Sequence, residues 1–341
     1  MPKPKAKKLP TSAGAVAAPD RPSSATRGRV SKKSQGVPVE TTGPKKTRGV
    51  PTGAAGLDVF AIGAPTSDRV LPEGFQSLPP AGLASATQPF EQLQWLSRRS
   101  GLSQQTPWGA LPLGFVEATG IALPVVARLC SEHDDRDAFI FNLTPSDEAI
   151  FANPLARAYV ARPELVKSMQ TLLESLHCPP SMSQALVGSS AFSISPFMVA
   201  RQALWVDFLA FLQPAHALAS GPFGASAGIH QPFDDSSQSL SEQTPFTVFM
   251  GAMLPHFLQS EAGKGYRVLK VSIPSLESSL NSHLQSLRQL RDAAAKTQSG
   301  WLIGAWLNYR NLYLLQVAGK AWCERHLRVL SEGVLVGVKN N

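Results

Sequence analysis

Strand-like and helix-like segments alternate along this chain from about residue 54 onwards. Residues 137–145 contain four apolar residues in a row, a pattern typical of a strand buried on both faces. Residues 162–177 place leucine and methionine at helical spacing behind a proline in the first turn. Residues 265–273 again have the character of a strand. This alternation predicts an α/β fold, in which helices cover the faces of a sheet.

The C-terminal part of the chain is predicted to be helical. Leucines recur at helical spacing through residues 272–294, behind a serine and a proline that are typical of a helix start. Residues 300–330 predict one or two further helices. We therefore expect a single α/β domain over residues 54–335, with residues 272–335 as its helical flank.

The first 53 residues differ in composition from the rest. Residues 1–50 carry 12 lysines and arginines against two acidic residues, whereas the remaining chain carries 20 against 22. The segment is poor in aromatic residues, so it cannot bury enough apolar surface to offset the loss of chain entropy. We predict a disordered basic tail over residues 1–53, with a solvated tail that has no partner as the alternative.

The charge of this tail suits an anionic membrane surface. Nucleic acid fits less well, because no aromatic residues are interleaved with the basic ones. No apolar run reaches the roughly 18 residues that a membrane span needs. Three scattered cysteines argue against a disulfide framework or a structural zinc site. We therefore predict a cytoplasmic protein without a transmembrane segment, held at the inner face of the membrane where its tail binds lipid.

The polar residues that follow the predicted buried strand are the first candidates for chemistry. Asn142, Asp147, Glu148 and Asn153 come after its carboxyl end, where ligands of open α/β sheets bind. Two carboxylates there suit Mg²⁺ or Mn²⁺. In the alternative interpretation, the asparagines make turn hydrogen bonds and the acids favour the start of a helix. The chain contains no Walker loop, GxGxxG, HExxH, GxSxG or kinase signature, which excludes those enzyme classes.

A second candidate lies in the stretch "TPWGALPLGFVEATGIALP", residues 106–124, where Glu117 is the only charged residue. A buried carboxylate must be paired or have a raised pKa. A raised pKa suits a general base. The alternative is a structural ion pair with Arg98 or Arg99.

Five segments between residues 57 and 315 follow one another in an order that carries a resemblance. They are "PFEQLQWLSRR", "WGALPLGFVEATGI", "RDAFIFNLTPSDEAIFANPLARAYVARPELV", "FSISPFMVARQALWVDFLAF" and "TPFTVFMGAMLPHFL". This order resembles an uncharacterised bacterial family of glycosyltransferase-like proteins that is associated with capsule and lipopolysaccharide gene sets.

The resemblance implies a GT-A-like layered domain that moves a sugar from a nucleotide-sugar donor to a cell-surface glycan or lipid-linked acceptor. It implies that Asn142, Asp147 and Glu148 face the donor phosphates or a Mg²⁺ or Mn²⁺ ion. Glu117 is then the candidate base for the acceptor, and aromatic side chains suit the apolar face of a sugar ring. The expected catalytic residues are Glu117, Asp147 and Glu148, and the expected substrate-binding residues are Trp108, Phe115, Asn142, Asn153 and Ser193.

The chain also departs from the pattern of that family. Residues 142–145 read Asn-Leu-Thr-Pro where the family has Asn-Pro, and residues 252–254 read Ala-Met-Leu where it has Glu-Arg-Leu. Arg162 stands where a histidine is expected. The loss of a charged pair favours a second hypothesis, a non-catalytic interaction protein of the same fold that its basic tail targets to nucleic acid or a membrane-bound complex.

Overall fold

The fold is that of a computed structural model, which describes residues 57–62, 71–78, 89–99, 102, 106–233 and 243–335. The chain divides into two compact units, Met1–Val50 and Pro51–Asn341, and every element below belongs to the second. The predicted basic tail therefore lies outside the described residues. Within the described ranges, no helix is long and apolar enough to cross a lipid bilayer.

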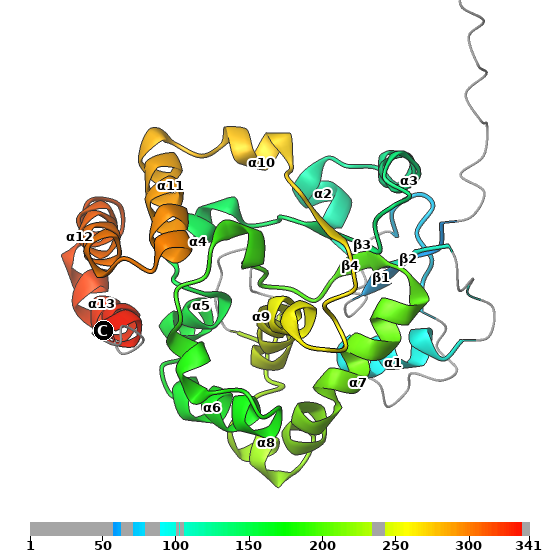
Figure 1. Cartoon of the computed structure of the whole chain (residues 1–341), viewed down its shortest axis with the longest axis horizontal. Helices are drawn as coiled ribbons and strands as arrows, with labels where there is room; N and C mark the ends of the chain where they lie inside the picture. The colour runs from blue at the N-terminus through cyan, green and yellow to red at the C-terminus, as the bar shows by residue number, and fades with distance from the viewer. Residues whose placement is uncertain are drawn as a thin grey trace, which may run out of the picture. The chain divides into compact units, whose positions relative to one another are not determined.

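A five-stranded mixed sheet forms the centre of the second unit, which confirms the predicted α/β class (Figure 1). Four strands run in one direction, and the central strand β4 runs antiparallel to both of its neighbours. In order across the sheet the strands are β1 (Val59–Ile62), β2 (Trp108–Pro112), β4 (Met198–Ala200), β3 (Ala138–Phe141) and β5 (Val268–Val271).

Helices cover both faces of this sheet, and the side chains of each strand alternate between the two layers. In β1, Phe60 and Ile62 join one apolar cluster while Val59 and Ala61 join the other. The smaller layer contains α2 (Phe115–Thr119) and α3 (Leu123–Glu132). The larger layer contains α1 (Pro89–Ser97), α5 (Pro154–Ala161), α6 (Leu165–Ser175), α7 (Gln202–Ala219) and α9 (Pro245–Gln259).

The stretch 106–124 contains a strand that its sequence does not suggest. It forms β2 and α2, although glycine and proline usually weaken strands. A Cβ atom on Gly109 would lie 2.9 Å from Val199 and 3.0 Å from Val59, side chains of the two neighbouring strands. Glycine at this position therefore allows the neighbouring side chains to close over β2.

The C-terminal part is helical, but the segment predicted as one helix over 272–294 is two. Helix α10 (Pro274–Ser278) ends before α11 (Ser282–Thr297) begins. Asn281 separates them, because its side chain accepts a hydrogen bond from the backbone N–H of Leu284 and so caps α11. The remaining short elements and the last helices are α4 (Pro145–Ile150), α8 (Pro222–Ser226), α12 (Gly300–Val317) and α13 (Lys320–Leu335).

Candidate functional site

The strand directions bring most of the predicted site residues to one edge of the sheet. Strands β1, β2, β3 and β5 are mutually parallel in direction, so their carboxyl ends meet there. Helices α2, α4 and α10 follow three of these strands, and the segment that enters β4 begins at the same edge. This is the edge at which α/β proteins bind ligands.

Glu148 of α4 lies inside the protein at this edge, with 1% of its surface exposed. The Lys270 ammonium group on β5 donates hydrogen bonds to its carboxylate and to the backbone carbonyls of Ser189 and Phe192. Arg288 of α11 approaches the other carboxylate oxygen, with Nη1 3.7 Å from Oε2. The carboxylate is therefore neutralised by cations of the same chain.

Arg291 completes this cluster from the next turn of α11 and is 0% exposed. Its guanidinium group donates to the Phe151 carbonyl at 3.2 Å and to the Ser189 hydroxyl at 3.1 Å, and lies 3.6 Å from the Asp292 carboxylate. It also lies 5.1 Å from the centre of the Phe192 ring, over its face. We call the set formed by Glu148, Lys270, Arg288, Arg291 and Asp292 the ionic cluster.

Burial opposes ionisation of three members of the ionic cluster, Glu148, Lys270 and Arg291. It raises the pKa of Glu148, and the charges of Lys270, Arg291 and Arg288 act in the opposite direction. Burial likewise lowers the pKa of Lys270, against the effect of Glu148. The pKa of Arg291 is lowered to about 10 for the same reason. Each charged form thus depends on its partners, which is the behaviour of a structural ion-pair network.

Asp147 also has a partner of opposite charge. Its carboxylate lies 3.4 Å from Nε of Arg157, and that guanidinium group lies over the Phe151 ring. Neither acid thus presents a free carboxylate to a metal–diphosphate complex. In the described part of the chain, no three His, Cys, Asp or Glu side chains gather as metal ligands would. The residues present at this edge therefore do not fit a Mg²⁺ or Mn²⁺ site.

The asparagines and the serine of the predicted site make local hydrogen bonds. The Asn142 side chain accepts from the backbone N–H of Thr144 at 3.4 Å, and the Ser193 hydroxyl donates to the Ser195 carbonyl at 2.8 Å. Turn hydrogen bonding was the alternative interpretation for both asparagines. Their binding to a ligand stays a prediction.

Asn153 is the most fully engaged of these residues. Its side-chain oxygen accepts from the backbone N–H of Ala156 at 2.9 Å and so caps α5. Its amide group donates to the carbonyls of Ser183 and Ala185 at 3.1 and 2.9 Å. Asn153 therefore joins the start of α5 to the 3₁₀ turn Pro180–Gln184.

The two aromatic residues predicted to contact a sugar lie in the core, each 1% exposed. The Trp108 ring stacks on Trp205 with 4.8 Å between centroids, and its indole N–H donates to Gln202 at 2.6 Å. Phe115 packs edge-to-face against Phe141 at 5.1 Å. Contact with a sugar stays a prediction, and it would require both rings to leave these partners.

Glu117 lies on the exposed face of α2, so the burial assumed for it from sequence is wrong. Phe115 and Thr119 of the same helix are buried, whereas Glu117 lies on the exposed side. Arg99, one of its expected partners, lies over the rings of Phe60 and Trp95.

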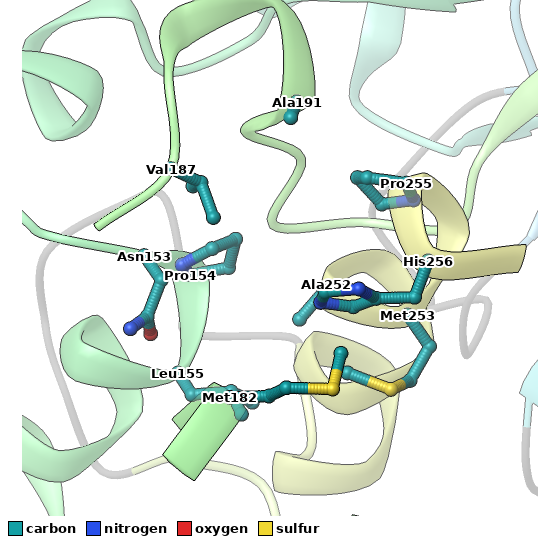
Figure 2. Close-up of a pocket in the computed structure, with 10 residues that line it drawn as sticks. All are labelled: Asn153, Pro154, Leu155, Met182, Val187, Ala191, Ala252, Met253, Pro255 and His256. Atoms are coloured by element: carbon teal, nitrogen blue, oxygen red, sulfur yellow. The ribbon is translucent and has the colours of Figure 1, made fainter. Parts of the chain in front are cut away.

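A pocket adjoins Asn153 between α5, α9 and the turn that contains Met182 (Figure 2). Met253 and His256 of α9 line its other side. Burial lowers the pKa of His256, so its imidazole is neutral at physiological pH. The pocket holds about 10 Å³, the space of one water molecule, whereas drug-sized ligands need several hundred.

Sequence reasoning missed the basic half of the ionic cluster, although two signals for it exist. Lys270 is the single charged residue within an apolar strand, where a buried charge needs a partner. Arg291 follows Leu287 by four residues, on the apolar face of its helix.

Comparison of the chain with protein-family models, with curated proteins and with solved structures gives no match.

Proposed function

We propose that this chain is an interaction protein built on an α/β domain of the glycosyltransferase-like kind, and that it does not itself transfer sugars. One observation carries the proposal: Glu148, the buried carboxylate of the expected catalytic edge, is neutralised by Lys270 and Arg288 of the same chain. A metal cation, or a positive charge that develops during a reaction, would have to displace both Lys270 and Arg288 from Glu148. Asp147 is engaged by Arg157 in the same way.

In this proposal the basic N-terminal segment supplies the binding function. Its 12 basic residues against two acidic ones would hold the protein on an anionic membrane surface. Binding of this kind weakens as salt screens the charges. The rest of the chain has a net charge close to zero. Its α/β domain would then present its own surface to a partner at that membrane.

Vesicle sedimentation of the full chain tests this. We expect binding to vesicles of phosphatidylserine and phosphatidylcholine at low salt, and little binding to phosphatidylcholine alone. A variant with Lys3, Lys5, Lys7 and Lys8 changed to Glu should lose most of the binding, whereas Lys264→Glu, on the surface of the α/β domain, should retain it. Equal binding by the two variants would reject the tail as the binding element.

Sugar transfer is the second candidate, because three cations of the ionic cluster converge at the carboxyl edge of the sheet. Nucleotide diphosphates are recognised by such groups. A calorimetric and thermal-shift screen of UDP-, GDP-, CMP- and dTDP-sugars with Mn²⁺ separates the two candidates. A donor that binds, and whose binding is lost in Arg288→Gln but kept in Glu117→Gln, would replace our proposal with a transferase.

A further inference from the structure

Helix α12 has large apolar side chains on its outer face. Trp301, Leu312 and Leu315 are 77%, 63% and 46% exposed. The opposite face carries Trp306 and Leu314, which are buried in apolar clusters with residues of α4, α5 and the C-terminal helices. The helix packs on α11 and α13 and leaves its outer face uncovered in the described part of the chain (Figure 1). A helix that is apolar on all sides is normally buried on all sides.

The same face carries no charge. Between Trp301 and Leu315 it presents Gly304, Ala305 and Asn308, and the one charged residue of α12, Arg310, is buried on the other side. Absence of charge combined with exposed aromatic and aliphatic groups is the composition of an interface centre. We call this surface the α12 outer face.

We propose that the α12 outer face binds the same face of a second copy of this chain, with the two helices antiparallel and the two-fold axis passing through Asn308. In that register the sequence is complementary to itself. Trp301 lies opposite Leu315 of the other copy, seven residues either side of Asn308, and Gly304 lies opposite Leu312, four residues either side. Contacts related in this way define an isologous two-fold interface.

Gly304 supplies the shape that this pairing needs. A Cβ atom placed on it would meet no other atom within 4 Å, so the glycine leaves an open notch on the helix surface. Glycine within a helix costs about 1 kcal/mol relative to alanine. In the paired state the notch receives the Leu312 side chain, and the two Asn308 amides can hydrogen-bond to each other at the axis.

The size of the face sets the strength of the expected dimer. A stripe from Trp301 to Leu315 is about 20 Å long at the rise of an α-helix. Two such stripes would bury on the order of 1,000 Å², near the lower limit for a specific interface. We therefore expect a dimer that dissociates on dilution.

Sedimentation of the full chain over a range of concentrations tests the proposal. We expect a monomer–dimer equilibrium that Leu312→Glu shifts to monomer, with a dissociation constant raised at least about tenfold. The matched control is Val317→Glu: Val317 is 59% exposed on the same helix but lies about 160° around it from Trp301. This control should dimerise as the parent does, and circular dichroism should show that both variants are folded.

Cross-linking tests the register. Asn308→Cys should form a symmetric disulfide between two copies under mild oxidation, whereas Ala305→Cys, one turn away from the axis, should form it much more slowly. The unmodified chain, with its three free cysteines, supplies the background. A chain that is monomeric at all concentrations would overturn the proposal, because another segment would then cover the face. Equal dimerisation of Leu312→Glu and its parent, or equal cross-linking at both positions, would also overturn it.

Discussion

The ionic cluster and the α12 outer face depart from normal burial in opposite directions. In the first, Glu148 and Arg291 are buried, and Lys270 and Arg288 are partly buried, between α4, β5 and α11. In the second, tryptophan and leucine side chains on the neighbouring helix remain in solvent. Proteins usually distribute these residue types the other way round.

What separates the two regions is whether the chain supplies the partners. Lys270 alone contacts Glu148 and two backbone carbonyls, and Arg291 contacts a carbonyl, a hydroxyl and a carboxylate. The ionic cluster is therefore complete within one chain and fixes α11 to the sheet. The α12 outer face has no partner among the described residues, and so points to a second molecule. A residue with unusual burial indicates binding to another molecule only where its own chain supplies no contacts for it.

The largest effect is expected from Lys270→Met, which leaves the buried Glu148 without its nearest cation. Breaking a buried ion pair on one side costs about 3–5 kcal/mol, because the remaining charge stays uncompensated. Urea unfolding should show this as a lower midpoint with little change in slope.

The double variant Lys270→Met with Glu148→Gln is the control for that experiment. It removes the uncompensated charge and should recover more than half of the lost stability. A loss below about 1 kcal/mol in the single variant would mean that Glu148 is accessible to solvent. The contrast with the α12 outer face would then disappear.

Asn153→Ala should have the next largest effect. It removes the cap of α5 and leaves the carbonyls of Ser183 and Ala185 without their donor. Loss of a cap costs about 1 kcal/mol and unsatisfied buried groups add to it, so we expect about 2–3 kcal/mol. Asn153→Asp keeps the capping oxygen and should lose less. Equal unfolding midpoints for Asn153→Ala and the parent would show that Asn153 is not structural, and would favour its predicted role in ligand binding.

Acid should destabilise the domain through His216, another buried polar residue. Its ring stacks on Phe90 at 4.0 Å between centroids, and burial lowers its pKa to about 4, with His230 acting in the same direction. The unfolded chain therefore binds the proton first, so this stability is complete above about pH 6.5 and is lost as the pH falls towards 4. We expect a loss of roughly 2 kcal/mol between pH 7 and pH 5.

His216→Phe should reduce that acid sensitivity, because a phenyl ring can stack on Phe90 without titrating. His177→Asn is the matched control: His177 is exposed, and asparagine tolerates its positive φ of 56°. Stability measured across pH 5 to 7 should change its slope in the first variant only. An unchanged slope in His216→Phe would assign the acid sensitivity to other groups.

The sequence allowed much of the architecture to be predicted, because its signals are local. The apolar run of β3 and the leucine spacing of α6 are visible in short windows, although α6 begins at Leu165, after the proline expected in its first turn. Strand β2 could not be predicted in that way, since it tolerates Gly109 only because neighbouring strands close over it. Its stability comes from its neighbours and not from its own residues.

The candidate site was harder to predict for a related reason. The acids that follow β3 were identified, but Lys270 lies 122 residues from Glu148 in sequence. No local pattern states which cation meets which carboxylate, and that pairing decides whether an acid is free to act. Glu117 shows the same limit, since it lies within an apolar stretch of sequence and its side chain is nevertheless exposed.

The smallest effect is expected from Glu117→Gln. Glu117 is exposed on a five-residue helix, so an amide of the same size leaves no buried group unpaired. Substitutions at such positions change stability by no more than about 0.5 kcal/mol. Glu148→Gln, measured beside it, should cost more, because Lys270 would lose the charge that compensates its own, whereas Arg288 keeps its ion pair with Glu277 at 2.7 Å. Equal costs for the two variants would show that burial does not distinguish these two carboxylates, both of which the sequence had placed among the expected catalytic residues.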